Sequence, residues 1–146
     1  MDKRIAQFYE AIGREMAVTL ATAAEGRVTM RLVSPVCWQK DILIFTRGDS
    51  LKYRQLKASP YCCVAAGGFY AEAKAAFLGA TLLEKNQAYR EAYAKKFPGA
   101  FDEGVAFGGR DAEFILLTPT RLTGWTFEND EPAQGGVPTA PFELTL

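Results

Sequence analysis

The stretch Phe45–Lys57, FTRGDSLKYRQLK, contains the end of a predicted strand, a tight turn and the start of a predicted helix. The helix begins at Ser50 and carries Lys52 in its first turn. The first N–H groups of a helix carry partial positive charge, so acidic residues are favoured there and a lysine is not. An anion bound by N–H groups, hydroxyls and the ammonium together explains Lys52. The alternative is a loop with a solvated lysine.

Around this stretch the chain alternates between short apolar strands and turns. Strands are predicted at residues 16–22, 28–36, 42–46, 61–66, 72–83 and 113–127, and helices at residues 2–12, after Ser50 and after Asn86. The second strand should be bulged or at an edge near Pro35, Gly79 should mark a bulge, and Pro119 should interrupt the sixth strand. Residues 42–46 are apolar on both faces, which indicates a central strand.

The first three strands have no helix between them, which excludes a doubly wound parallel sheet. The pattern favours a mainly β fold, an antiparallel barrel with added helices. Residues 1–128 are predicted to form the domain. Residues 129–146 are rich in proline, glycine and acidic residues, and are expected to be a tail that is disordered or laid over a neighbour.

Composition excludes several functional classes. The 146 residues suffice for one domain, and 17 basic residues balance 17 acidic ones, which gives no support for a nucleic-acid or membrane-surface partner. No apolar run approaches the roughly 20 residues that span a bilayer, and the N-terminus does not resemble a signal peptide. We therefore expect a cytoplasmic protein whose three cysteines are small buried hydrophobic residues.

The chain has no histidine. This excludes Ser-His-Asp and Cys-His catalysis and every histidine-bearing metal site. No catalytic residue and no metal site can be named from the sequence. If the protein is an enzyme, a cofactor is expected to supply its reactivity.

Arg31 is the second candidate for the anion site. It lies between Met30 and Leu32 on the second predicted strand, so its side chain should emerge on the opposite face. If the second and third strands pair, Arg31 approaches Thr46 and Lys52. Two cations and the hydroxyls of Thr46 and Ser50 match a phosphate of about −1.5 to −2 charges. The alternative is an exposed arginine on the polar face of a hairpin.

Three motifs, taken in order and spacing, resemble the pyridoxamine 5′-phosphate oxidase-like family of flavin-binding split barrels. They are Leu20-Ala-Thr22, Arg31-Leu-Val33, and Phe45-Thr46 followed by Ser50 and Lys52. The resemblance covers roughly residues 1–128. It implies a six-stranded antiparallel split barrel and a homodimer with two flavin mononucleotide (FMN) sites at the subunit interface.

The resemblance also implies roles for individual residues. Arg31 and Lys52 would hold the FMN phosphate, with hydroxyl donation from Ser50 and Thr46. The backbone at Leu32 and Val33 would lie along the flavin ring, with Phe45 beside it. The remaining candidates are Leu51 between the serine and the lysine, and Lys74 and Trp125, which would reach the flavin of the other subunit.

Departures from the family pattern narrow the function. Leu51 replaces a basic residue common in the oxidase proper, and no histidine follows Trp125. We therefore expect a protein that is not a working pyridoxamine phosphate oxidase. The leading hypothesis is an FMN-dependent oxidoreductase acting on a small conjugated substrate. The alternatives are a non-enzymatic flavin carrier or electron-transfer protein, and a relative that binds deazaflavin or heme.

Overall fold

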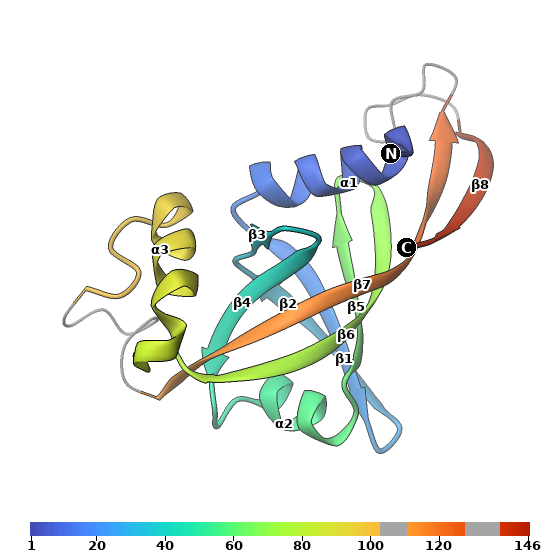
Figure 1. The fold of residues 1–146 in the computed structure, drawn as a ribbon. Coiled ribbons are helices and arrows are strands. Elements are labelled where there is room, and N and C mark those ends of the chain that lie inside the picture. Colours follow the sequence, from blue (N-terminus) through green and yellow to red (C-terminus); the bar gives the residue numbers. More distant parts are fainter. Residues whose placement is uncertain (103–110, 128–137) are drawn as a thin grey trace.

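The computed structural model describes residues 1–102, 111–127 and 138–146. Its helices are α1 (Lys3–Arg14), α2 (Leu51–Ala58) and α3 (Gln87–Lys96), with a short 3₁₀ turn, η1 (Glu84–Asn86), before α3. Its strands are β1 (Val18–Ala24), β2 (Arg27–Val33), β3 (Val36–Trp38), β4 (Asp41–Arg47), β5 (Tyr61–Ala66), β6 (Phe69–Ala80), β7 (Ala112–Phe127) and β8 (Pro138–Thr145). Figure 1 shows α1 and α2 at opposite ends of the curved sheet. Within the described ranges, no helix has the length and apolar character needed to cross a bilayer.

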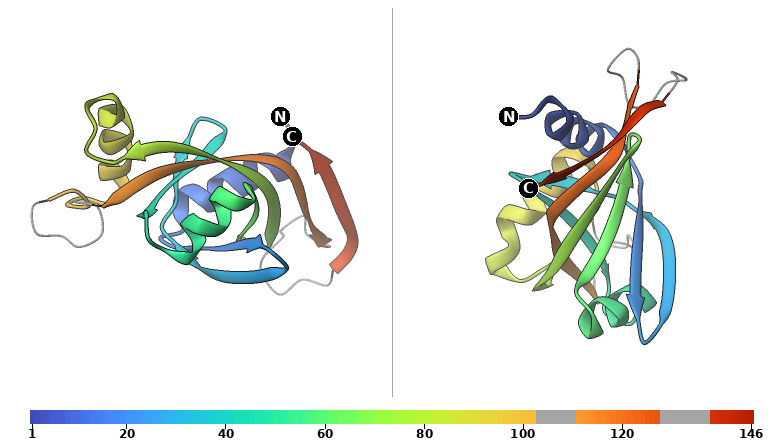
Figure 2. Two further views of the ribbon diagram at one scale, coloured as in Figure 1. Left: turned by 90° about the horizontal axis from the view of Figure 1, so that it is seen from below. Right: turned by 90° about the vertical axis from the view of Figure 1, so that its right-hand side faces the viewer.

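The strands form one antiparallel sheet that curves strongly without closing (Figure 2). Its order is β2-β1-β5-β6-β7-β4-β3, and β8 pairs with β7 outside this path. The mainly β, antiparallel fold with added helices is therefore confirmed. Strand β4 lies between β7 and β3, as its two apolar faces predicted.

The described part of the chain has eight strands, whereas the sequence predicted six. One of the two extra strands arises because Ser34 and Pro35 separate β2 from β3. Pro35 has no N–H to donate to a neighbouring strand, so the pairing stops and resumes on a different partner. The other extra strand is β8, in the segment expected to be a tail.

The pairing of β6 with β7 contains two register shifts. In the first, Glu72 pairs with Arg121 and Ala73 with Pro119, so Thr120 is an additional residue. A bulge is one of the few places where a sheet accommodates proline, and β7 continues through Pro119 where an interruption was predicted. The second shift lies at Gly79, which has a φ of +83°. The predicted bulge at this glycine is confirmed.

Strand β8 corrects the expectation of disorder for residues 138–145. Its Phe142 ring packs edge-on against Phe69 of β6, with 6.0 Å between ring centroids. The Arg4 guanidinium of α1 lies 4.6 Å from the centroid of the same ring. A partly buried aromatic ring and a cation–π contact outweigh the polar composition around them. The boundary predicted between residues 128 and 129 lies outside the described residues.

The two faces of β4 pack into different hydrophobic clusters. Ile42 and Ile44 join the main core, which α1 covers, with Phe8, Leu20, Val64, Phe69 and Ile115. Leu43 and Phe45 point the other way, into an aromatic cluster against α3 that includes Trp38, Tyr89, Tyr93, Phe97, Phe101 and Phe114. Thr46, the next residue after Phe45, therefore faces the α2 end of the main core.

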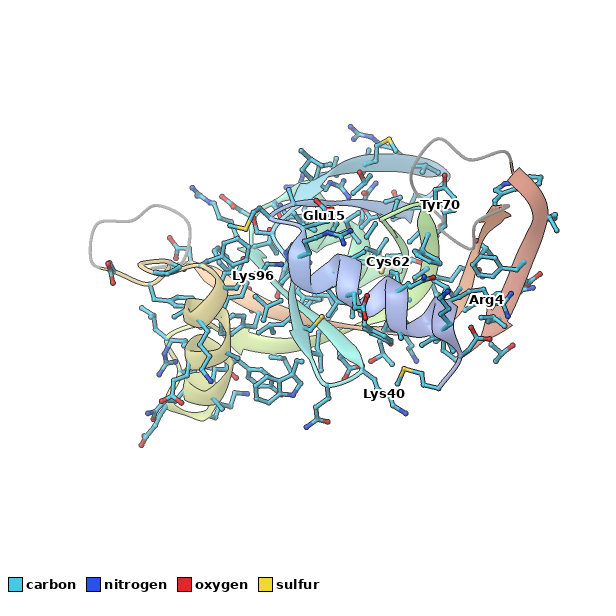
Figure 3. The ribbon with its side chains drawn as sticks, turned by 90° about the horizontal axis from the view of Figure 1, so that it is seen from above. Arg4, Glu15, Lys40, Cys62, Tyr70 and Lys96 are labelled. Atoms are coloured by element: carbon cyan, nitrogen blue, oxygen red, sulfur yellow. The ribbon has the colours of Figure 1, made fainter. Side chains whose placement is uncertain are left out.

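Lys96, in the last turn of α3, joins three separate segments (Figure 3). Its ammonium donates hydrogen bonds to the carbonyl oxygens of Ile12 and Glu15, at 2.8 and 2.6 Å, and of Pro35 at 2.8 Å. Two of these carbonyls belong to the end of α1, which lacks intrahelical donors and attracts a cation. Lys96 thus fixes α3 against α1 and against the chain that enters β3.

We expect Lys96→Met to destabilise the protein by about 2 kcal/mol, because it leaves three carbonyl oxygens without their charged donor. Equilibrium urea unfolding measures this loss. Lys95→Met provides the matched control, since Lys95 is the exposed neighbour on the same helix. Equal stability of the two variants would show that the three hydrogen bonds contribute nothing.

Candidate functional site

The start of α2 has the capping arrangement that the sequence predicts. The Ser50 hydroxyl accepts a hydrogen bond from the Tyr53 backbone N–H at 3.2 Å. It also lies 2.9 Å from the hydroxyl of Thr46 at the end of β4. No acidic residue occupies the first turn of the helix, where Lys52 stands instead. The positive end of this helix therefore has no negative charge of its own.

The β1–β2 hairpin carries Thr22, Thr29 and Arg31 on its inner face, beside buried apolar residues, and the outer face of β2 is apolar. On β2, Thr29 and Arg31 are half-buried and Val33 is buried, whereas Val28, Met30 and Leu32 are 69–73% exposed. Arg31 does lie opposite its apolar neighbours, as expected from strand alternation. The face that turns inward, however, is the one carrying the arginine, not the one carrying Met30 and Leu32.

Hydrogen bonds fix the guanidinium of Arg31. Its Nη1 donates to the Thr22 hydroxyl at 2.7 Å and to the Leu20 carbonyl oxygen at 3.2 Å. Its Nη2 donates to the Thr29 hydroxyl. Both hydroxyls in turn donate to the side-chain oxygen of Gln55 on α2, each at 2.6 Å. The arginine is therefore held between the hairpin and α2.

The positively charged guanidinium of Arg31 lies near the positively charged ammonium of Lys52. Burial lowers the pKa of Lys52, and the charge of Arg31 lowers it further. Burial also lowers the pKa of Arg31. Within residues 1–102, 111–127 and 138–146, neither side chain forms an ion pair with a carboxylate. Two neighbouring, partly buried cations without an anion repel one another and are poorly solvated. The arrangement is electrostatically suited to accept an anion.

The structure brings together only some of the predicted site residues. Thr46 and Ser50 meet at the start of α2, and the charge of Arg31 acts on Lys52 in the first turn of that helix, where Leu51 is half-buried. Phe45 is not with them: its ring lies 4.9 Å from that of Tyr93, in the aromatic cluster against α3. Adjacent strand residues point to opposite faces, so only the backbone of Phe45 borders Thr46.

Lys74, Trp125 and Leu32 are on the outer face of the sheet, away from the inward-facing Arg31. Leu32 is 69% exposed, and Val33, the neighbouring candidate, is buried. Lys74 is exposed, and its ammonium lies 5.9 Å from the ring centroid of Tyr61. Trp125 is 47% exposed and pairs with Pro141 of β8. Within one protomer, the predicted site residues therefore fall into two groups, one near Arg31 and one on the outer face of the sheet.

The outer face of the sheet is largely uncharged at its β2 side. The strand register places Met30, Ala21, Cys63 and Glu72 in one row across β2, β1, β5 and β6. A hollow of about 680 Å³ opens over this row. Its lining includes Ala21, Ala23, Val28, Tyr61, Cys63 and Arg121. Glu72 and Thr120 also line the hollow, so its lining is mixed. The apolar part of this face is the set of exposed residues Val28, Met30 and Leu32 on β2, and exposed apolar residues grouped in this way are typical of a protein interface.

Sequence reasoning missed the polar network behind Arg31. Thr22 and Thr29 are directly opposite each other in the hairpin, and Gln55 is almost completely buried. Thr22 and Thr29 could have been found from the sequence, because they are hydroxyl residues at paired positions of the hairpin that contains Arg31. Nothing in the helix sequence distinguishes Gln55 from a solvent-exposed glutamine, because its burial follows from how α2 docks on the hairpin.

Comparison with solved structures identifies the fold. No protein-family model matches the chain, and no curated protein has a significantly similar sequence. Solved structures match well at low identity. A Listeria innocua protein provisionally identified as a pyridoxamine 5′-phosphate oxidase has a TM-score of 0.64 at 11% identity, over 82% of this chain and 96% of that one. An FAD-binding protein of Mesorhizobium loti has a TM-score of 0.64 at 12% identity, over 84% and 92%.

A heme-binding protein of Mycobacterium smegmatis has a TM-score of 0.72 at 13% identity, over 99% of this chain and 59% of that chain. Identities this low establish the fold and leave ligand and activity open. The resemblance read from the sequence is thereby confirmed at the level of the fold. The chain has the split-barrel fold that the pyridoxamine 5′-phosphate oxidase-like flavin-binding proteins share.

Proposed function

We propose that the protein binds FMN as a homodimer and acts as a flavin-dependent oxidoreductase on a small conjugated substrate. The observation that carries the proposal is the pair of cations, Arg31 and Lys52, without an anionic partner among the described residues. A phosphate of about −1.5 to −2 charges compensates both. Thr46 and Ser50 support the same assignment, because their hydroxyls lie at the positive start of α2.

In this proposal each remaining candidate has a defined part. The backbone at Leu32 and Val33 would border the flavin ring, and Leu51 would border the phosphate. Bound FMN would supply the hydride and single-electron chemistry that the chain's own side chains lack. The protein's residues hold the phosphate and, in the dimer, exclude water from one side of the ring. No residue is assigned a catalytic role.

In the proposed homodimer, a second copy of the chain covers the outer face of the sheet. Val28, Met30 and Leu32 form an apolar stripe there, and a stable dimer buries roughly 800 Å² on each partner. Lys74 and Trp125 lie on this face too, so in a dimer they are available to the flavin held by the other subunit. The dimer thereby accounts for candidates that one protomer leaves away from Arg31.

Steady-state oxidation of NADH or NADPH with a panel of quinone and nitroaromatic acceptors separates this function from that of a flavin carrier. Turnover supports the oxidoreductase. A flavin-loaded protein that is inactive with every donor and acceptor supports the carrier. Release of FMN from the purified protein, identified by its absorption spectrum, distinguishes both from relatives that bind deazaflavin or heme.

We expect Arg31→Met and Lys52→Met each to weaken FMN binding by about tenfold or more, because each removes one charge-assisted hydrogen bond of about 1.5–3 kcal/mol. Riboflavin, which lacks the phosphate, should bind both variants as it binds the wild type. Flavin fluorescence titration measures both affinities. Lys57→Met is the matched control, because Lys57 is an exposed lysine on the same helix. An equal loss for FMN and riboflavin would contradict the phosphate assignment.

The pH dependence of FMN affinity should show an alkaline limb that belongs to Lys52. Burial lowers the pKa of this ammonium in the ligand-free protein, and a bound phosphate favours the charged form. FMN affinity should therefore fall as pH rises through the lowered lysine pKa. Lys52→Arg should remove this limb, because arginine stays charged throughout. A limb that persists unchanged in Lys52→Arg assigns the titration to another group.

We expect Met30→Glu to convert the dimer to a monomer, because it places a carboxylate in the centre of the apolar stripe. Sedimentation velocity measures the oligomeric state. Leu82→Glu is the control, since Leu82 is 53% exposed in the turn that follows β6, away from the stripe. A Met30→Glu protein that sediments as the wild type would exclude this face as the interface.

A further inference from the structure

Gln55 is a buried polar residue beneath the guanidinium of Arg31. It is 4% exposed, on the side of α2 that faces the β1–β2 hairpin. Its amide nitrogen donates to the Arg27 carbonyl oxygen at 3.1 Å. Since a carbonyl oxygen only accepts, this contact identifies the end of the amide at Arg27 as the nitrogen. The amide oxygen is thereby directed at Thr22 and Thr29.

The direction of these hydrogen bonds determines how the two threonines treat Arg31. A glutamine oxygen only accepts, so the hydroxyl protons of Thr22 and Thr29 both point to Gln55, each across 2.6 Å. The hydroxyl lone pairs are then left for Arg31, whose Nη1 and Nη2 donate to them. One glutamine oxygen therefore makes both hydroxyls acceptors for the same guanidinium.

This network selects the edge of Arg31 that is left for a ligand. A guanidinium has five N–H groups, and three of them are donated to Leu20, Thr22 and Thr29. Within the described residues, Nε–H and the second N–H of Nη2 have no acceptor. These two lie side by side and match two oxygens of one phosphate or carboxylate. The network thus presents a bidentate edge in a fixed orientation.

We propose that Gln55 is a positioning residue that sets the phosphate selectivity of the site, acting through Thr22 and Thr29 on Arg31. This inference rests on the proposed function, since the phosphate is that of FMN. It adds that charge alone is insufficient: Arg31 must be held with its Nε–Nη2 edge toward the ligand. Without Gln55 the hydroxyls are free to donate elsewhere, and Arg31 loses its fixed acceptors.

The test compares FMN with riboflavin in Gln55→Leu and Thr29→Val. Each variant should bind FMN about tenfold more weakly, as expected for a charge-assisted hydrogen bond that is no longer aligned, with riboflavin affinity unchanged. Thr29→Ser, which keeps the hydroxyl, should restore FMN affinity. Gln87→Leu replaces an exposed glutamine on α3 and should bind both flavins as the wild type does. Equal losses of FMN and riboflavin in both variants would overturn the proposal.

A second measurement needs no flavin. In the ligand-free protein, ¹⁵N-detected arginine side-chain NMR should show the Arg31 Nη protons as separate, slowly exchanging signals, assigned by their absence in Arg31→Met. Gln55→Leu should merge these signals and speed their exchange. If the wild type binds no flavin, the proposed function fails and this arm still decides the role of Gln55. Signals unchanged in Gln55→Leu overturn the positioning role, whatever the flavin affinities.

Discussion

Electrostatic repulsion between Arg31 and Lys52 is the constraint on which the site depends. Folding brings a guanidinium from the hairpin and an ammonium from α2 to the same place, and the described residues supply no carboxylate to neutralise them. Such an arrangement lowers the stability of the ligand-free protein relative to one with a neutral side chain at either position. Selection for stability alone does not produce it. Binding of an anion reverses the sign of the interaction.

The threonines and the glutamine around Arg31 offset part of the free-energy cost of placing this cation beside Lys52. Burying part of a guanidinium costs less when its donors find acceptors, and the hairpin supplies two hydroxyls and one carbonyl for three of the five N–H groups of Arg31. Gln55 closes the network from the helix side. The same α2 helix that brings Lys52 to the site therefore also anchors its partner cation, so docking of α2 and assembly of the site are one event.

Much of the fold could be predicted because it depends on local patterns. The apolar alternation of the strands, the cap at Ser50 and the bulge at Gly79 are each set by neighbours in sequence. The failures involve contacts between distant segments. Strand β8 forms because Phe142 meets Phe69 and Arg4, and no pattern near residue 142 contains those partners. Pro119 remains in a strand because a bulge opposite β6 accommodates it.

The candidate site divides in the same way. Thr46 and Ser50 meet at the start of α2, next to Lys52, as their spacing predicted. Arg31 was expected to reach them through pairing of its strand with the strand that ends at Thr46, and this was wrong, because β2 pairs with β1 and not with β4. Arg31 nevertheless lies close enough to Lys52 to lower its pKa. Met30 and Leu32 are apolar, yet both are 69% exposed. In the proposed dimer the second copy of the chain would cover them. Phe45 was assigned to the site by its position in the sequence alone. Its ring packs instead in the aromatic cluster against α3.

The turn between β1 and β2 determines which side chains of β2 face the proposed ligand site and which face the proposed dimer surface. Glu25 and Gly26 both have positive φ, +53° and +77°, as a two-residue hairpin turn of the primed type requires. This turn alone sets the registry of Arg31 against Leu20. Inserting a single residue there would shift β2 by one position and exchange its faces, turning Leu32 inward and Arg31 outward. One loop length therefore decides which set of β2 side chains faces inward, so the proposed cofactor site and the proposed dimer surface depend on the same turn.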